Sequence, residues 1–99
     1  MKIRWTEKAS SDALGIFDYI ARQSPSYADS VYERLLARPL QLTAHPLSGS
    51  IVPELGREDI RELFVYSFRL IYRVAKDEIR VVTVIHGGRE LKPEMIVEA

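Results

Sequence analysis

Hydrophobic side chains recur every three or four positions in the first part of the chain, which is the spacing of a helix that packs on one face. The repeat follows Thr6, a favourable N-cap, and Glu7, whose charge suits the first turn of a helix. Gly15 lies inside the repeat and weakens it. The pattern predicts a helix over about residues 7–22, with an apolar stripe of Ala9, Ala13, Ile16, Phe17, Ile20 and Ala21.

A second helical stripe begins after the break at residues 24–26. Ser26, followed three residues on by Asp29, approximates a capping box, and Pro39 should kink or end the helix. The stripe consists of Ala28, Val31, Tyr32, Leu35, Leu36 and Leu42. Because the two helices are joined by a very short connection, they are expected to form an antiparallel hairpin.

The remaining elements have a period of two, which is typical of strands. Residues 2–5 alternate as a short strand, and residues 45–57 form a loop with a strand fragment at Ile51-Val52. Three further strands rich in Val, Ile, Tyr and Phe are predicted at Ile60–Val65, Phe68–Ala75 and Ile79–His86. Their two-residue links, 66–67 and 76–77, predict an antiparallel meander.

The last two strands are expected to have unlike faces. A turn at Lys76-Asp77 places Val74 opposite Ile79 and Arg73 opposite Arg80. One face is then almost entirely apolar and should receive the helices: Phe68, Leu70, Tyr72, Val74, Ile79, Val81, Thr83 and Ile85. The other mixes cations with aliphatics: Arg69, Ile71, Arg73, Arg80, Val82, Val84 and His86. Two helices cannot cover both faces, so the mixed face is expected to be an exposed protein-binding surface.

Arg69 and Arg89 are the candidate functional residues on this hairpin. Gly87 and Gly88 let the chain turn after the last strand, so Arg89 can fold back toward Arg69. The structural alternative is that Arg69 forms an ion pair with Glu62 on the neighbouring strand.

Composition narrows the class of protein. Ninety-nine residues with 46% hydrophobic side chains make one folded domain, residues 1–99. The net charge of zero weighs against a nucleic-acid partner without excluding it, and there is no cysteine. No apolar run has transmembrane length, so a cytoplasmic protein is expected. Enzyme signatures such as phosphate loops and metal-ligand spacings are missing, so neither a cofactor nor a metal is expected.

Several residue strings, in this order and spacing, resemble the toxins of the RelE/ParE superfamily of bacterial toxin–antitoxin systems. The resemblance covers nearly the whole chain and is closer to the ParE branch. The strings are Trp5-Thr6…Ala9, Asp18-Tyr19-Ile20-Ala21, Leu42…His45-Pro46…Gly49, Pro53-Glu54-Leu55, Ile60-Arg61-Glu62-Leu63, Phe68-Arg69-Leu70-Ile71-Tyr72-Arg73-Val74 and Val84-Ile85-His86-Gly87-Gly88-Arg89.

The resemblance implies an α+β fold in which one strand, a helical hairpin and a three-stranded meander follow in order, with the first strand joining the sheet. It also implies a toxin held inactive by a cognate antitoxin, most often in a hetero-oligomer. ParE-like members poison DNA gyrase, and on that interpretation the target-binding residues are Arg61, Arg69, Arg73 and Arg89. The antitoxin is expected to cover Ile71, Arg80, Val82 and Val84.

RelE-like members instead cut mRNA on the ribosome, and Arg69 and Arg89 match the positions where such nucleases hold the scissile phosphate. With His86 or Glu54 moving protons, these arginines would form the catalytic group. The chain lacks the loop lysines and the C-terminal tyrosine of those nucleases, so the gyrase-directed interpretation comes first and the endoribonuclease second. A third alternative is a non-toxic remnant that still binds an antitoxin.

Overall fold

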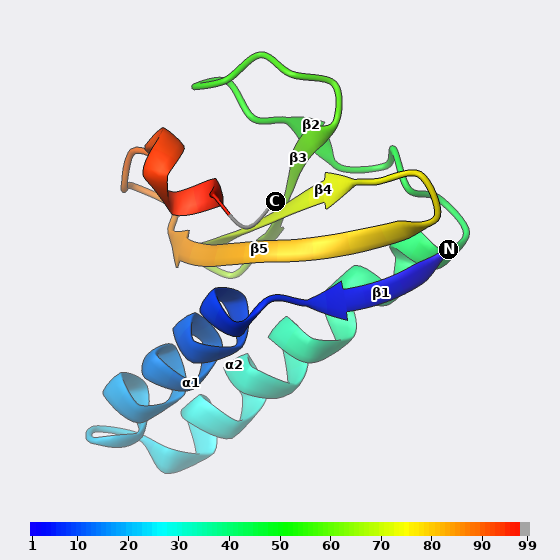
Figure 1. The fold of residues 1–99 in the computed structure, drawn as a ribbon. Helices are drawn as coiled ribbons and strands as arrows, with labels where there is room; N and C mark the ends of the chain where they lie inside the picture. The colour runs from blue at the N-terminus through cyan, green and yellow to red at the C-terminus, as the bar shows by residue number, and fades with distance from the viewer. Residues whose placement is uncertain (98–99) are drawn as a thin grey trace.

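The computed structural model describes residues 1–97, so the last two residues of the predicted domain lie outside it. Figure 1 shows a helical hairpin beneath a twisted sheet, with a loop and a short C-terminal helix above it. This α+β order confirms the predicted fold class. The elements are β1 (Lys2–Trp5), α1 (Glu7–Ala21), α2 (Pro25–Ala37), the 3₁₀ helix η1 (Arg38–Thr43), β2 (Ser50–Ile51), β3 (Ile60–Val65), β4 (Phe68–Val74), β5 (Glu78–His86) and the 3₁₀ helix η2 (Pro93–Ile96).

Local capping explains where the helices begin and end. The Thr6 hydroxyl accepts a hydrogen bond from the Ala9 amide and starts α1 as predicted. The N-cap of α2 is Ser24 rather than the predicted Ser26, because Pro25 occupies the first helical position, where its missing N–H costs nothing. Pro39 ends the α-helix, and the chain continues as η1.

The sheet has the order β1-β5-β4-β3-β2 and is mixed. β3, β4 and β5 form the predicted antiparallel meander. β2 pairs antiparallel with β3 and lies at Ser50–Ile51, one residue before the predicted fragment. β1 lies parallel to β5 with Ile3 opposite Ile79. The first strand therefore joins the sheet, as the family resemblance implies. Within residues 1–97, no helix is both long enough and apolar enough to cross a membrane.

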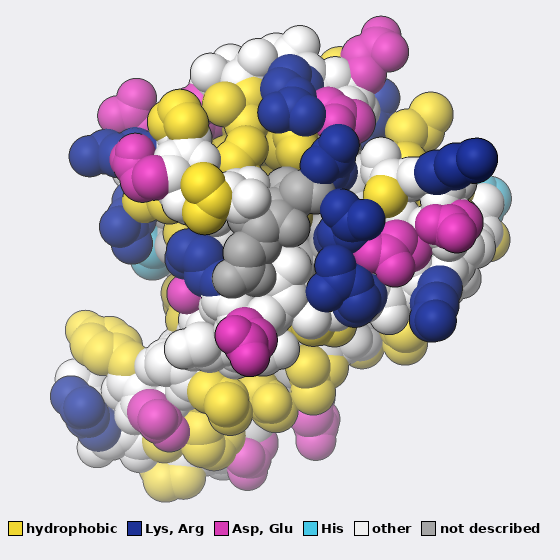
Figure 2. Space-filling view, viewed as in Figure 1, with side chains coloured by type: hydrophobic (Ala, Val, Ile, Leu, Met, Phe, Trp, Pro, Cys, Tyr) yellow, Lys and Arg dark blue, Asp and Glu magenta, His cyan; other side chains and the backbone are white. Residues whose placement is uncertain are grey.

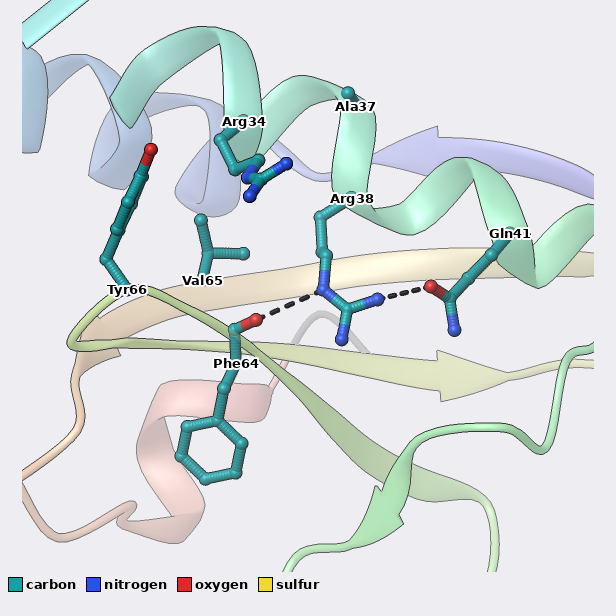
Figure 3. A pocket seen from close by; sticks show the side chains of 7 residues that line it. All are labelled: Arg34, Ala37, Arg38, Gln41, Phe64, Val65 and Tyr66. Atoms are coloured by element: carbon teal, nitrogen blue, oxygen red, sulfur yellow. Dashed lines mark hydrogen bonds between the residues drawn. The ribbon is translucent and has the colours of Figure 1, made fainter. Parts of the chain in front are cut away.

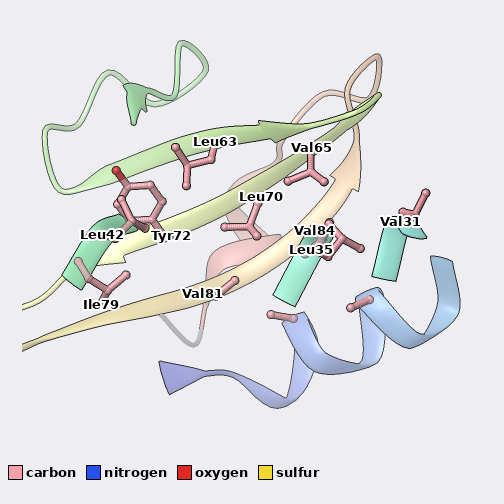
Figure 4. Packing of buried hydrophobic residues seen from close by; sticks show 12 residues of the cluster. Val31, Leu35, Leu42, Leu63, Val65, Leu70, Tyr72, Ile79, Val81 and Val84 are labelled. Carbon is pink, nitrogen blue, oxygen red and sulfur yellow. The ribbon is translucent and has the colours of Figure 1, made fainter. Parts of the chain in front are cut away.

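The main hydrophobic core lies between the helical hairpin and one face of the sheet (Figure 4). Ala9 and Ala13 are small enough to bring α1 close to the strands, and Val31 and Leu35 fill the space beside α2. From the sheet, the fully buried side chains include Leu70, Tyr72, Ile79 and Val81.

A β-bulge at Val82 changes which side chains face the helices. The predicted pairs Val74–Ile79 and Arg73–Arg80 are confirmed, but beyond them the register shifts between Ile71 and Tyr72. An extra residue in one strand moves every later side chain to the opposite face. Val84 therefore faces the helices, and the prediction that Val84 and His86 lie on the mixed face is wrong. Ile85 moves the other way, to the face of Arg69 and Ile71. Thr83 pairs with Ile71, and its hydroxyl donates a hydrogen bond to Asp12 of α1.

The face opposite the helices is covered by a second, smaller core. Leu91, Met95 and Ile96 from the C-terminal segment, with Val52 and Leu55 from the loop, pack against the side chains of Ile60, Ile71 and Ile85. The exposed fractions of Ile71, Val82 and Val84 are 0%, 1% and 3%. The prediction of an exposed aliphatic face is therefore wrong: the C-terminal segment covers Ile71, and the bulge turns Val84 into the helix-facing core.

Candidate functional site

Arg69 lies at the centre of a buried ion cluster. Its Nε donates to Glu62 Oε1 at 2.6 Å, and its two terminal nitrogens donate to the Glu54 carboxylate at 2.8 Å each. The Arg69 side chain is 6% exposed, and Glu62 is equally buried. The predicted structural pair with Glu62 is thus present, with Glu54 completing a fork-on-fork contact.

The cluster also holds the C-terminal segment against the sheet. Arg69 Nη1 donates to the Arg89 carbonyl at 3.1 Å, and the Leu91 amide donates to Glu54 Oε2 at 2.7 Å. The pKa of Glu54 is lowered to about 2, mainly by its hydrogen bonds from Arg69 and next by the hydrogen bond from the Leu91 amide. The two carboxylates in turn raise the pKa of Arg69. The three side chains therefore join the loop, the sheet and the segment that covers the second core.

The predicted nuclease residues are not brought together. Arg69 pairs with Ile85 and His86 with Phe68, so the side chains of Arg69 and His86 lie on opposite faces of the sheet. His86 packs edge-on against Phe68, and its Nδ1 accepts from the Gly88 amide. Glu54, with a pKa of about 2, is ionised at neutral pH and cannot serve as a general acid. Arg89 contacts Arg69 only through its backbone carbonyl, which accepts a hydrogen bond from Arg69 Nη1.

Three arginines lie side by side on the face of the sheet away from the helices. The strand pairing places Arg4 opposite Arg80, and Arg80 opposite Arg73. Glu78 pairs with both Arg4 and Arg80, which lowers its pKa, and Asp59 lies 3.3 Å from Arg73. Figure 2 shows basic side chains in a band over the sheet, with acidic ones beside them. We call Arg4, Arg73 and Arg80 the arginine row.

Arg61 has a structural place. Its guanidinium donates to the carbonyls of Glu58, Leu47 and Gly49, so it ties the loop before β2 to β3. Of the four predicted target-binding arginines, Arg61 and Arg69 are thus engaged within the chain, and Arg73 belongs to the arginine row.

An apolar groove runs along α1, which sequence reasoning missed. Its walls come from Ile16, Tyr19 and Ile20 of α1 and from Val84 at the end of β5, with Arg89 at its rim. Tyr19 is 69% exposed. We call this the α1 groove, and its composition is that of a protein-binding surface.

Gly15 on this groove is the sequence signal that could have revealed it. A Cβ at Gly15 would meet no atom within 4 Å, so the fold of the chain does not require glycine there. Glycine inside a helix costs about 1 kcal/mol relative to alanine. Its presence fits a partner that approaches the backbone of α1 closely.

Glu54 makes the stability of the chain depend on acid pH. Its folded-state pKa of about 2 lies below the usual 4.5, so its contribution is complete above pH 4.5 and is lost as the pH falls toward 2. We expect Glu54→Gln to destabilise the chain at neutral pH by an amount that shrinks as the pH falls through this window. Urea unfolding of both proteins from pH 7 downward measures it, and a constant difference would contradict the assignment.

Comparison with known proteins agrees with the fold. Residues 3–91 match the sequence profile of the ParE toxin of the type II toxin–antitoxin system parDE. The chain therefore belongs to the ParE toxin family, which confirms the resemblance drawn from its residue strings. A solved structure described as the chromosomal ParDE TA system from P. aeruginosa has a TM-score of 0.74 and 22% identity, covering 87% of this chain and 95% of that chain. At that identity the likeness shows a shared fold. Curated proteins give no significant sequence match.

Proposed function

We propose that residues 1–99 form a single toxin domain that acts in the bacterial cytoplasm by poisoning DNA gyrase and is neutralised by a cognate antitoxin. One observation carries the choice of gyrase over mRNA: Arg69, which matches the position where RelE-like nucleases hold the scissile phosphate, is instead paired with Glu54 and Glu62 within the chain. On this proposal the chain acts by binding and performs no chemistry of its own.

The arginine row is the surface we propose for contact with the target. Arg4 and Arg73 keep 51% and 36% of their side-chain surface exposed despite their carboxylate partners. Arginine forks beside partly exposed carboxylates suit a protein surface carrying charges of both signs. Arg89, at the rim of the α1 groove, is a second candidate.

Gyrase poisoning and mRNA cleavage can be separated in one experiment. The chain is induced without a partner, and early samples are examined for DNA-damage signalling and for mRNA integrity. Purified chain incubated with gyrase and plasmid is expected to accumulate cleaved plasmid. Arg73→Glu should reduce this cleavage. The control is Arg22→Glu, which changes an exposed arginine at the end of α1 and should leave cleavage unchanged. Immediate loss of transcripts with gyrase unaffected would contradict the proposal and favour the endoribonuclease. Normal growth at high expression would favour a non-toxic remnant.

The α1 groove is the surface we propose for the antitoxin. Ile71 and Val82, predicted from the sequence as its anchors, are buried, so Val82→Asp would unfold the chain rather than report on binding. Val84 lines the α1 groove but is itself buried, so the exposed apolar contact there is Tyr19. An apolar segment with an acidic group for Arg89 fits this surface.

Gly15→Ala tests the α1 groove. The substitution should stabilise the free chain by about 1 kcal/mol, because alanine is the better helix former and its Cβ meets nothing. It should weaken the antitoxin complex if a partner backbone approaches α1 at this point. Urea unfolding and calorimetric titration give the two values. A stabilised chain with unchanged antitoxin affinity would remove the groove as the antitoxin site.

A further inference from the structure

A different groove opens beside α2, between the end of that helix, the start of η1 and the turn that joins β3 to β4 (Figure 3). Its volume is roughly 490 Å³, and we call it the hairpin groove. It shares no lining residue with the α1 groove. Neither the arginine row nor the Arg69 cluster contributes to it.

Two arginines on α2 and η1 face this groove without a carboxylate. Arg34 and Arg38 lie one turn apart, and like charges at that spacing destabilise a helix. The helix C-terminus offsets part of this repulsion. Within residues 1–97, neither of them forms an ion pair, in contrast to the arginines that do: Arg4, Arg57, Arg69, Arg73 and Arg80.

The guanidinium of Arg38 is fixed in place before any partner arrives. Its Nε donates to the Phe64 carbonyl at 3.1 Å, and Nη1 donates to Gln41 Oε1. Figure 3 shows both bonds, and the remaining terminal nitrogen of Arg38 takes part in neither of them. Because the Arg38 guanidinium is already held in one orientation, it loses little conformational freedom when it binds a carboxylate.

Tyr66 forms the other wall and is 52% exposed. Phe64 contributes its backbone carbonyl, and its ring points to the opposite side of β3, the side of Arg69 (Figure 3). Tyr66 has a φ of 52° at the tip of the hairpin, in the left-handed region where its Cβ is strained. Tyr27 packs edge-on against its ring, and the Arg34 guanidinium lies 5.8 Å from the ring centre. An exposed tyrosine held in a strained position is a feature that binding sites retain.

We propose that the hairpin groove binds an acidic segment of a partner protein. A carboxylate of that segment lies between Arg34 and Arg38, and an adjacent aliphatic or aromatic side chain packs on Tyr66. Tyrosine and arginine together are the residues that dominate binding energy in protein interfaces. This proposal does not depend on gyrase being the target.

The test begins with selection of random peptides displayed on beads against the whole chain. The proposal expects recovered peptides to carry Asp or Glu next to Phe, Leu or Ile. A selected peptide is then labelled and its affinity measured by fluorescence anisotropy. Arg34→Gln and Arg38→Gln should each weaken binding roughly tenfold, since a charged hydrogen bond contributes about 1.5 kcal/mol. Arg22→Gln is the matched control and should leave the affinity unchanged.

Tyr66→Gly guards against misfolding as an explanation. Glycine accepts the positive φ without strain, so this variant should fold while binding the peptide more weakly. Recovery of basic peptides, or equal affinity for a version with Asn and Gln in place of the acids, would overturn the proposal. Displacement of the peptide by equimolar inorganic phosphate would also overturn it and would assign the groove to a phosphate. A dimer of the wild-type chain that Arg34→Gln dissociates would overturn it as well and would assign the groove to a second copy.

Discussion

Replacement of Arg69 by alanine is expected to destabilise the chain by about 3–5 kcal/mol, whatever it does to toxicity. The substitution leaves Glu54 and Glu62 facing each other without their cation, and removing one member of a buried ion cluster strands the charges that remain. It also frees the Arg89 carbonyl and so loosens the C-terminal segment. Urea unfolding followed by the fluorescence of Trp5, the single tryptophan, measures the loss.

Two further variants show whether the effect of Arg69→Ala is structural. Arg57→Ala removes a half-exposed arginine from its pair with Asp59 and should cost less than about 1 kcal/mol. Adding Glu54→Gln and Glu62→Gln to Arg69→Ala should recover part of the stability, because the stranded charges are gone. If Arg69→Ala were as stable as Arg57→Ala and yet inactive, Arg69 would have to contact the target, and the endoribonuclease alternative would return.

Leu91→Ala is expected to cost about 2–5 kcal/mol, which is large for a residue so close to the end of the chain. Leu91 is 2% exposed and belongs to the second core with Ile71 and Ile85. The truncation leaves a cavity on the face that the helices do not cover. Thermal or urea unfolding measures it.

The control for Leu91→Ala is Val97→Ala, which removes a side chain that is 80% exposed on the same segment and should leave stability unchanged. Combining Leu91→Ala with Arg69→Ala should cost less than the sum of the two, because both loosen the same segment. Equal stability of Leu91→Ala and Val97→Ala would mean that the segment does not cover the sheet in solution.

The predicted elements agree closely with the structure because their signals are local. Thr6 caps α1, Pro39 ends α2, and the two-residue turns set the ends of the meander. Each depends on a few neighbouring residues and on backbone chemistry that acts within a turn. The Arg69–Glu62 pair could also be predicted, since adjacent strands bring those positions together.

The predicted assignment of side chains to the two faces of the sheet is wrong beyond one residue of β5. Alternation assigns every side chain from a single register, so one bulge at Val82 exchanged the faces of Val84 and Ile85. The same step moved His86 away from Arg69 and removed the nuclease constellation. Nothing in the local sequence marks that bulge, because it satisfies the packing of β5 against β4 and the helices together.

The sequence by itself determined the family, the order of elements and the helix-facing side chains up to the bulge, because caps, turns and periodicity act over a few residues. Only the tertiary structure decided which arginines are available to a partner. Arg69 and Arg61 are bound by groups far along the chain, at Glu54 and at the Gly49 carbonyl, whereas neither Arg34 nor Arg38 forms an ion pair within residues 1–97. A guanidinium binds whichever acceptor folding brings nearest, and that distance is set by contacts between segments rather than by the residues beside it.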